Sequence, residues 1–582
     1  MIEEYGIDIE QLFEKFHEYG NRKAIIEQSH NITYADLKHV INVIGENLQE
    51  QSLKSVAICT DNRMNVIMIA LSCIFVRIPF IVIDGKNPKT FNEKILEEAN
   101  INNVICEGSF VLNSVNCIPF ERLKQPSQKE IQKNKISGDR VLFYIATSGS
   151  TGKPKVAERY VSAFCRDYFE VESKFHFLFN QIAQQYAKLN FSYGLENTLL
   201  LLFGGTTICF GEKNISKNDM ELMFAEINKN QATVVFWATP IIKLFSKHFR
   251  LAEKIPECIK YIYTGGEPLV VSADFVVILK NKCITLINDY GCSEIGKIFT
   301  YLFNIKLRDM DVYNMVGVGK ALKGYEAVIL DEELKEVDEG FLYLKSKEKF
   351  KCGYVNKLID TNEIEADGYW LYKMQDIAKR DNGEIVILGR EINSVNVSGY
   401  RVELEQVEYA INAINGVVIC VVLPYYNQYR EANLYCFYVG KIDSKDLRTQ
   451  LNERIPKYMI PTAFINVEDI YLLPNGKVDR KCNKEKFDSI IQVKNENVGE
   501  LKERIYKYLV SIVGMEIGVL SDIYLMPFSE YGIDSLSLVD FISTIEEKEK
   551  ILISGDLIGK QIKCIKDIVE WVNDNLCESD EV

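Results

Sequence analysis

Residues 144–155 read YIATSGSTGKPK and continue directly from an apolar run. Glycines at 149 and 152 allow backbone N–H groups to come close to an anion. The familiar phosphate loop, GxxxxGK followed by Ser or Thr, has more widely spaced glycines and a helix after its lysine. Here Pro154 follows Lys153 at the point where that helix would have to continue. The stretch therefore predicts a strand and a phosphate-binding loop of another kind, in which hydroxyls and a lysine hold the anion.

Short β-rich runs alternate with helical patterns through the first 385 residues. The runs predicted as buried strands are 55–59, 80–84, 141–147, 232–237 and 259–264. This alternation predicts an α/β body whose largely parallel β-sheets are flanked by helices. Asp381-Asn382-Gly383 separates two further runs and predicts a hairpin.

The chain changes character after residue 390. A helix near 403–414 and the run VVICVVL predict a smaller α+β unit. The polar stretch 494–500, KNENVGE, is interpreted as a linker. Beyond it, apolar residues recur at helical spacing with hardly any β-rich runs, which predicts a small helical bundle.

Length and charge narrow the functional classes. At 582 residues the chain is too long for one core. Its net charge of -14 argues against a nucleic-acid partner, because phosphate binding needs a basic face. Arg77 and Pro79 interrupt the apolar run 66–83, which predicts a buried helix and strand and no membrane span.

Cysteine spacing and the N-terminal sequence indicate the cellular compartment that we expect for the protein. The 15 cysteines form no CxxC pair, so we expect reduced, buried thiols. The acidic N-terminus has no apolar segment of the kind found in secretory signals. We therefore expect a cytoplasmic protein with neither a nucleic-acid nor a membrane partner.

The stretch TSGSTGKPK resembles the phosphate loop of the adenylate-forming superfamily, which comprises acyl-CoA synthetases, luciferases and the adenylation domains of nonribosomal peptide synthetases. Other motifs of that superfamily have counterparts in the same order. They are YTGGEPL at 263–269, NDYGCSE at 288–294, the aspartate at 376, GREINSVNVSGYRVE at 389–403 and LLPNGKVDRK at 472–481. The resemblance implies an enzyme that uses ATP and Mg²⁺ to convert a carboxylic acid into an acyl adenylate.

The same resemblance assigns roles to residues. Lys477 would lie between the substrate carboxylate and the phosphate oxygens, where negative charge gathers. Glu294 would bind Mg²⁺, because hard cations take carboxylate ligands. Ser293 and Arg390 complete the implied catalytic set, at the α-phosphate and at the ribose or phosphates. The implied ATP-binding residues are Thr147, Ser148, Gly149, Ser150, Thr151, Gly152, Lys153, Gly265, Gly266, Glu267, Asn288, Asp289, Tyr290 and Asp376.

A second motif lies near the C-terminus. Asp534 and Ser535 precede an amphipathic helical pattern, so either residue can be a helix N-cap. The stretch GIDSL at 532–536 also resembles the phosphopantetheine attachment motif of carrier proteins. That resemblance implies a 4′-phosphopantetheine arm on Ser535, placed there by a phosphopantetheinyl transferase. The thiol of this arm would take the acyl group from AMP within the same chain.

Together the two resemblances imply three parts. A large N-terminal adenylate-forming body with helix-flanked β-sheets would span residues 1–390. A small α+β C-terminal subdomain would span residues 391–490. An all-α four-helix carrier bundle would span residues 498–578.

The stretch FSYGLENT at 191–198 narrows the range of carboxylic acids that we expect as substrates. Ser192 stands where amino-acid-activating members have an aspartate for the α-amino group, and an ammonium buried without a counter-charge is costly. The segment also resembles benzoate-type ligases. The predicted pocket residues are Ser192, Tyr193, Trp237, Gly265, Asp289, Lys297 and Ile298, with Glu196 nearby. Tyr193 and Trp237 would sandwich a ring, which favours an aryl acid, while Asp289 offers an alternative anchor for the amine of a β-amino acid.

Several positions depart from the superfamily pattern, among them Gln375, Ile392 and Cys292. Two alternatives therefore stay open beside the aryl-acid ligase. One is an amino-acid-activating module with an unusual amine anchor. The other is a nucleotide-binding scaffold that has lost catalysis and presents the carrier. As partners we expect the small acid, the transferase, and downstream condensation, ketosynthase or tailoring enzymes of a nonribosomal peptide or polyketide-type pathway, as in antibiotic biosynthesis.

Overall fold

The computed structural model divides the chain into two compact units, Met1–Ile470 and Tyr471–Val582. The residues that the structure describes are 9–107, 112, 115–125, 139–147, 154–211, 220–247, 249–266, 268–303, 313–350, 352–355, 362–381, 383–390, 394–397, 400–426, 432–472, 478–513, 524, 535–549, 553 and 564–576.

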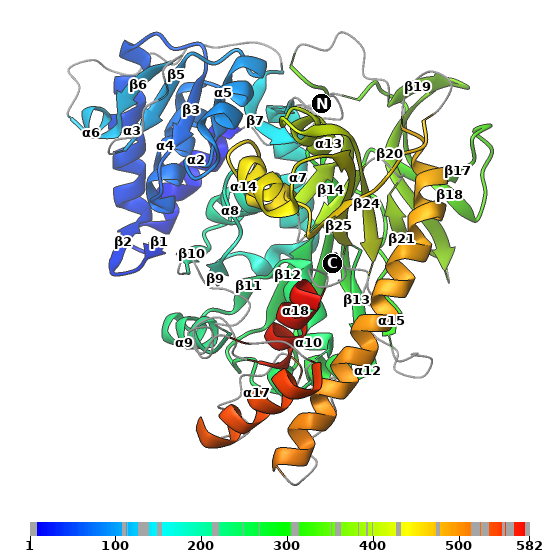
Figure 1. The fold of residues 1–582 in the computed structure, drawn as a ribbon. Coiled ribbons are helices and arrows are strands. Elements are labelled where there is room, and N and C mark those ends of the chain that lie inside the picture. The colour runs from blue at the N-terminus through cyan, green and yellow to red at the C-terminus, as the bar shows by residue number, and fades with distance from the viewer. Residues whose placement is uncertain are drawn as a thin grey trace. The chain divides into compact units, whose positions relative to one another are not determined.

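Two large sheets form the centre of the first unit (Figure 1). The six-stranded sheet has the order β6 (Asn116–Pro119), β5 (Asn103–Cys106), β3 (Val56–Cys59), β4 (Phe80–Val82), β7 (Val141–Thr147), β8 (Lys155–Tyr160). The eight-stranded sheet has the order β15 (Gly296–Phe303), β14 (Thr285–Cys292), β12 (Tyr261–Gly265), β11 (Val234–Phe236), β9 (Ile182–Gln185), β10 (Thr207–Phe210), β1 (Lys23–Glu27), β2 (His30–Thr33). Only the pairs β7–β8, β14–β15 and β1–β2 are antiparallel, so the predicted, largely parallel α/β body is confirmed.

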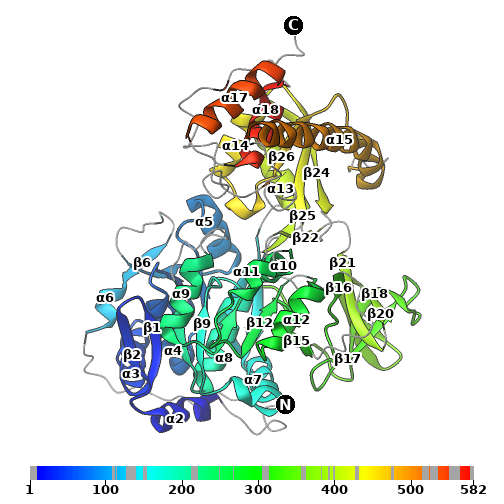
Figure 2. The same cartoon turned by 90° about the horizontal axis from the view of Figure 1, so that it is seen from below.

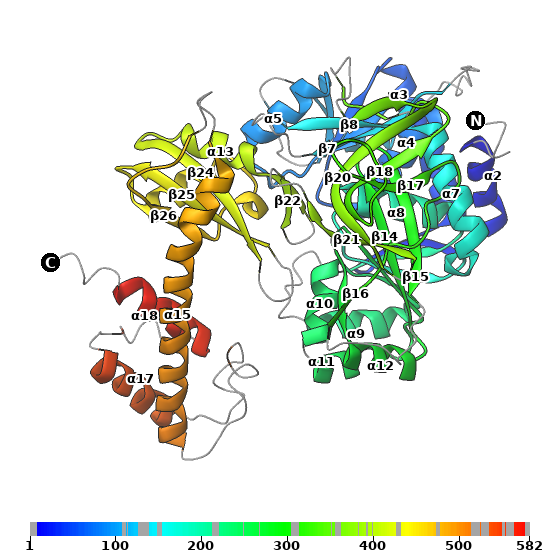
Figure 3. The same cartoon turned by 90° about the vertical axis from the view of Figure 1, so that its right-hand side faces the viewer.

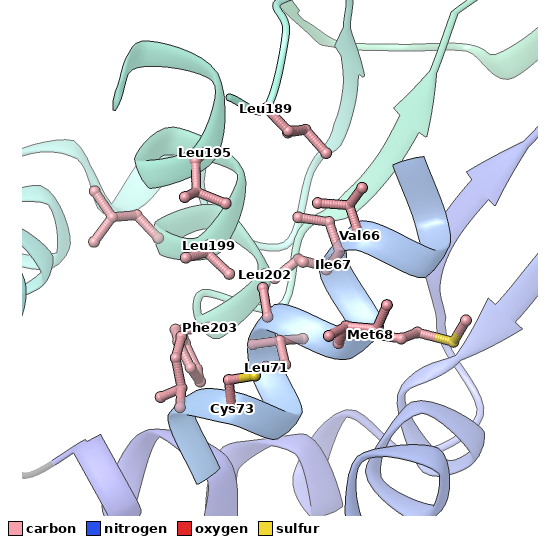
Figure 4. Close-up of a cluster of buried hydrophobic side chains, with 14 of the residues drawn as sticks. Val66, Ile67, Met68, Leu71, Cys73, Leu189, Leu195, Leu199, Leu202 and Phe203 are labelled. Carbon is pink, nitrogen blue, oxygen red and sulfur yellow. The ribbon is translucent and has the colours of Figure 1, made fainter. Parts of the chain in front are cut away.

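Helices α4 (Arg63–Val76) and α8 (Ser192–Phe203) contribute to one apolar core with strands of both sheets. Figure 4 shows side chains of α4, including Ile67 and Leu71, facing those of α8, including Leu199 and Phe203. Buried side chains occur all around α4, as expected for a helix enclosed by other elements. The run 66–83 is thus a buried helix and the strand β4, as predicted, and none of the described helices has the length and apolarity to cross a membrane.

Further helices cover the sheets. Figure 3 shows α10 (Thr239–Lys247), α11 (Phe249–Glu253) and α12 (Ala273–Asn281) grouped together. Helix α10 packs against β12 and β13 (Val270–Ser272). Helix α7 (Val161–Phe175) follows β8 directly and packs against β8 and β15. These contacts bring α7 close to the turn between β14 and β15.

An antiparallel sheet follows in the chain (Figure 2). Its strands are β17 (Glu326–Leu330), β18 (Glu339–Ser346), β19 (Glu363–Ala366), β20 (Tyr369–Asp381) and β21 (Glu384–Arg390). The predicted hairpin is confirmed, because Asp381 on β20 pairs with Glu384 on β21. The pair β22 (Ser394–Val397) and β23 (Tyr400–Glu403) then leads into α13 (Leu404–Asn412), α14 (Ser444–Asn452) and the sheet β24 (Val417–Tyr426), β25 (Ala432–Gly440), β26 (Ala463–Asn466).

The described part of the second unit is mainly helical, with one isolated β-bridge between Leu472 and Val478. Helices α17 (Ser535–Glu549) and α18 (Ile565–Leu576) lie beside α15 (Arg480–Val513), as Figure 3 shows. Leu501, Ile505, Ile545 and Val572 are among the buried side chains of their shared core. The expectation of a linker at 494–500 is wrong, because α15 continues through these residues.

Candidate active site

A cavity of about 150 Å³ in the first unit collects residues from several predicted motifs. Strand β7 contributes Thr147 at its end, and the first turns of α8 contribute Ser192 and Tyr193. The remaining lining residues are Ala146, Phe191, Glu196, Asn197, Gly266, Asp289, Gly291, Cys292, Ser293, Gly296, Lys297, Asn396 and Tyr458. Polar groups from parts of the chain far apart in sequence thus converge on one space, which is the usual form of a ligand site.

Strand β14 connects this cavity to a smaller one of about 30 Å³. Asn288, Asp289, Tyr290 and Asp376 line the smaller cavity, and Asp289 lines both. The hydroxyl of Tyr290 hydrogen-bonds the carboxylate of Asp376, and the amide of Asn288 donates to the carbonyl oxygen of Gly317 at 3.1 Å. Four residues that the resemblance assigns to ATP binding are therefore neighbours.

Two glycines follow one another at the end of β12, and only the second of them lines the cavities. Gly265 ends β12 opposite Asp289, and a Cβ at Gly265 would lie 2.3 Å from the Asp289 carbonyl oxygen. Gly266 has a φ of 92°, in the region that side chains disfavour, and it lines both cavities. Position 265 therefore requires glycine for close approach of the backbone, and position 266 favours glycine because of its positive φ.

Glu294 lies one residue beyond Ser293 in the turn between β14 and β15. Its side chain is buried and accepts a hydrogen bond from the hydroxyl of Tyr354. Among the described residues no group of three or more His, Cys, Asp or Glu side chains is suited to a metal ion. A single carboxylate fits Mg²⁺ in a nucleotide site, because that ion usually takes one or two carboxylates and completes its shell with phosphate oxygens and water. Glu294 would hold such an ion, which would neutralise charge on the triphosphate.

The buried side chain of Arg159 contacts Glu196, which lies on α8 and lines the cavity. The Arg159 guanidinium, on β8, donates to both carboxylate oxygens of Glu196, at 3.0 and 3.1 Å. It also donates to Asp167 Oδ2 at 2.9 Å and to the Ile295 carbonyl oxygen at 2.6 Å. Burial alone would lower the pKa of Arg159, but the carboxylates of Glu196 and Asp167 raise it above its ordinary value. Ser192 donates its hydroxyl hydrogen to Glu196 Oε1 at 2.7 Å.

A second ion pair lines the cavity directly. Lys297 Nζ, on β15, donates to Asp289 Oδ2 at 2.8 Å and to Asn197 Oδ1 at 2.6 Å. It also donates to the hydroxyl of Tyr263. Burial, reinforced by the Asp289 charge, raises the pKa of both Tyr263 and Tyr193 well above the ordinary value, so both phenols are neutral. The Lys297 and Asp289 side chains are only 4% and 10% exposed, so the pair is nearly enclosed.

Three predicted pocket residues do not line the cavity, namely Gly265, Trp237 and Ile298. Trp237 is fully buried in a separate apolar cluster, where its ring packs against Phe224 and Phe245. Ile298 is fully buried in another cluster, because it follows Lys297 in β15 and neighbouring side chains of a strand face opposite ways. The predicted sandwich of a ring between Tyr193 and Trp237 is therefore wrong.

Some predicted residues fall outside the described part of the chain. They are Ser148, Gly149, Ser150, Thr151, Gly152, Lys153, Glu267 and Lys477. For Arg390 and Ser535 the structure describes the backbone only. Arg390 ends β21 opposite Asp376 on β20, and Ser535 is the first residue of α17. The roles assigned to all of these residues stay predictions.

The side chains of the site that sequence reasoning missed include Arg159, Asp167, Asn197, Tyr263 and Tyr354. A signal existed for Arg159. Arg159 shares a face of β8 with the buried Ala157, and a charge at such a position needs a buried partner. Nothing in the sequence indicated which acid would pair with it.

The sheets, the cavity and the motifs around it define an adenylate-forming enzyme, and comparisons with known proteins agree. The family model described as AMP-binding enzyme matches residues 12–354, and the model described as phosphopantetheine attachment site matches residues 507–572. The first match covers more than half of the chain. The chain therefore belongs to the AMP-binding enzyme family, and it carries a phosphopantetheine attachment region. This class of acid–thiol ligase uses ATP, Mg²⁺ and 4′-phosphopantetheine.

Individual relatives agree with this class. Gramicidin S synthase 2 of Brevibacillus brevis is 25% identical over an alignment of 590 residues, which covers 97% of this chain and 13% of that protein. This chain thus spans a small part of that relative. A nonribosomal peptide synthetase protein containing adenylation and PCP domains, in its holo form, covers 98% of both chains with a TM-score of 0.67 and 18% identity. A mutant o-succinylbenzoate CoA synthetase of Bacillus subtilis has a TM-score of 0.70 and 18% identity, covering 81% of this chain and 98% of its own. The two structures establish the likeness of fold.

Proposed function

We propose that this chain activates a carboxylic acid that lacks an α-ammonium group and loads it onto an arm on Ser535. In the first step a carboxylate oxygen attacks the α-phosphorus of ATP, and pyrophosphate leaves. In the second step the pantetheine sulfur attacks the acyl carbon, AMP leaves, and the thiol proton passes to solvent. The acylated carrier would then serve condensation, ketosynthase or tailoring enzymes.

The proposed class of substrate acid rests on the pairing of charges at the cavity. Among the described lining residues the carboxylates are Glu196 and Asp289, and each is paired with a buried cation. Ser192 lies at the start of α8 and already donates its hydrogen to Glu196. An ammonium ion brought into this space would lose its water shell and find no unbalanced negative charge to replace it. Free α-amino acids are therefore disfavoured.

Aryl acids come first in the proposed substrate range. Tyr193 lines the cavity and can contact a bound aryl ring, although the second wall of the expected sandwich is missing. The cavity of about 150 Å³ suits a small acyl group.

ATP–pyrophosphate exchange across aryl, aliphatic and amino acids tests the proposal. We expect exchange with small aryl or aliphatic acids and little with amino acids. A preference for amino acids would favour a module with another amine anchor, and exchange with no acid would favour a catalytically inactive scaffold.

The carrier step has its own test. Ser535→Ala should leave exchange unchanged and abolish both pantetheine attachment and acyl loading, measured by intact mass. Ser537→Ala, two residues further along α17, is the matched control and should load normally. Pantetheine on the Ser535→Ala protein would overturn the carrier assignment.

A further inference from the structure

We call the part of the cavity lined by Ser192, Tyr193, Asp289 and Lys297 its polar end. Most hydrogen-bond donors there already bind acceptors within the protein. Lys297 Nζ has three hydrogens and makes three hydrogen bonds, to Asn197, Asp289 and Tyr263. Tyr193 donates its hydroxyl hydrogen to the Tyr263 carbonyl oxygen at 2.8 Å. A bound acid therefore meets few donors at this end.

Acceptors are left over at the same end. Asp289 Oδ1 accepts from the Thr300 hydroxyl at 3.2 Å and Oδ2 accepts from Lys297, and the Tyr263 hydroxyl is also hydrogen-bonded to this carboxylate. A carboxylate can accept about four hydrogen bonds, so one acceptor position is left. Ser192 Oγ has given away its hydrogen, so toward a ligand it acts only as an acceptor. The side chain of Asp289 lines the cavity and is 10% exposed. The polar end is thus built to receive a hydrogen-bond donor.

The ion pairs at the cavity indicate whether the hydrogen-bond donor of the substrate is charged or neutral. The cations Arg159, Arg166 and Lys297 balance the carboxylates Asp167, Glu196 and Asp289 in one connected cluster. Lys297 is hydrogen-bonded to Asp289, so an ammonium donor to Asp289 would lie close to a second cation. Like charges at such a separation repel strongly where water is excluded. A neutral donor avoids this repulsion and its own desolvation costs far less.

We propose that the acid carries a hydroxyl group on its acyl part and that Asp289 accepts the hydroxyl hydrogen. Asp289 and Lys297 are then specificity residues that recognise a neutral donor and reject an ammonium ion. This inference rests on the proposed function, since it names the substrate class of the same site. The class is that of hydroxy acids with an otherwise uncharged acyl part.

Matched acids test the inference on the unaltered full-length chain. One set is propanoate, 2-hydroxypropanoate and 2-aminopropanoate. A second set is benzoate, its hydroxy derivatives and its aminomethyl derivatives, with the substituent at each ring position. In the set that the enzyme uses, the hydroxy acid should exceed the unsubstituted acid about tenfold in kcat/KM for exchange, the effect of one hydrogen bond to a charged acceptor. The ammonium-bearing acid should fall below both.

Charge variants give the same test in the opposite direction. Lys297→Met removes the cation and leaves Asp289 unbalanced, so use of the ammonium-bearing acid relative to the hydroxy acid should rise about tenfold or more. Asp289→Asn leaves the cation unbalanced and should instead favour acids with a second carboxylate. Lys335→Met is the matched control, because Lys335 pairs with Glu333 at an exposed site and should not change the preference.

The outcomes separate the two proposals. Equal kcat/KM for hydroxy and unsubstituted acids at every position, or a preference for the ammonium-bearing acid in the unaltered chain, overturns this inference and leaves the ligase intact. Exchange with no acid at all overturns the proposed function itself. The test with matched acids uses the unaltered chain, so it remains decisive even if Lys297→Met fails to fold.

Discussion

Replacing Arg159 by methionine should destabilise the first unit by about 3–5 kcal/mol, the usual cost of removing one partner of a buried ion pair. Methionine fills much of the space of the arginine stem, so the change tests charge more than packing. The side chain of Arg159 is 1% exposed, and that of its partner Glu196 is 4% exposed.

The expected loss of stability follows from the hydrogen bonds that the two carboxylates, Asp167 and Glu196, retain without Arg159. Asp167 keeps two hydrogen bonds from Arg166, at 2.7 and 3.0 Å, and therefore stays paired. Glu196 loses both hydrogen bonds from Arg159 and keeps only the Ser192 hydroxyl. The loss thus amounts to one unbalanced carboxylate. Removing that charge in addition, with Arg159→Met and Glu196→Gln together, should return about 2 kcal/mol of the free energy of unfolding.

Urea unfolding followed by tryptophan fluorescence measures these changes. A Trp571→Phe background confines the signal to Trp237 and Trp370, both in the first unit. Arg380→Met is the matched control, because Arg380 pairs with Glu336 at a more exposed site and should cost about 0.2–1 kcal/mol. A loss below about 1 kcal/mol for Arg159→Met, or a double variant no more stable than the single one, would refute the reasoning.

Three further predictions test other parts of the chain. Gly296→Ala should cost at least about 2 kcal/mol in urea unfolding, because its φ is 91° and a Cβ would lie 2.1 Å from the buried guanidinium; an unchanged midpoint contradicts this. Tyr354→Phe should raise the Mg²⁺ concentration for half-maximal exchange about tenfold, because its hydroxyl orients Glu294; an unchanged Mg²⁺ titration argues against that role. Hydrogen bonding by Arg504 lowers the pKa of Glu549 below its ordinary 4.5, so the pair stabilises the second unit above that pH and the stabilisation disappears on acidification. Glu549→Gln should therefore cost about 0.5–1 kcal/mol near neutral pH and nothing in acid, and calorimetry showing a pH-independent loss would exclude the linkage.

The sequence predicted the large elements because their signals are local. Strand β7 has the bounds expected from its apolar run, and the other four strands lie within two residues of their expected bounds. The error at 494–500 has a physical origin. Polarity was taken to indicate an irregular linker, yet a mainly polar stretch can continue a helix whose flanking turns carry buried side chains, as at Phe487 and Leu501.

The site was harder to predict because it depends on which way side chains face. Motif order identified Ser192, Asp289 and Lys297, which line the cavity. It also selected Ile298, although two neighbours on one strand cannot both face the same space. Trp237 failed for a related reason, since a residue just beyond a strand end has no face that periodicity determines.

The cluster around Arg159 also explains why this pocket can tolerate Ser192 in place of an aspartate. A carboxylate at the first position of α8 would add a fourth negative charge beside Glu196, against three cations. Ser192→Asp should therefore create the unbalanced charge that an amino acid needs, and exchange with amino acids should rise relative to hydroxy acids. The same variant in the Lys297→Met background should shift this preference further, because both changes make the pocket more negative. If Ser192→Asp leaves the ratio of amino-acid to hydroxy-acid exchange unchanged, charge balance does not govern the choice of acid in this site.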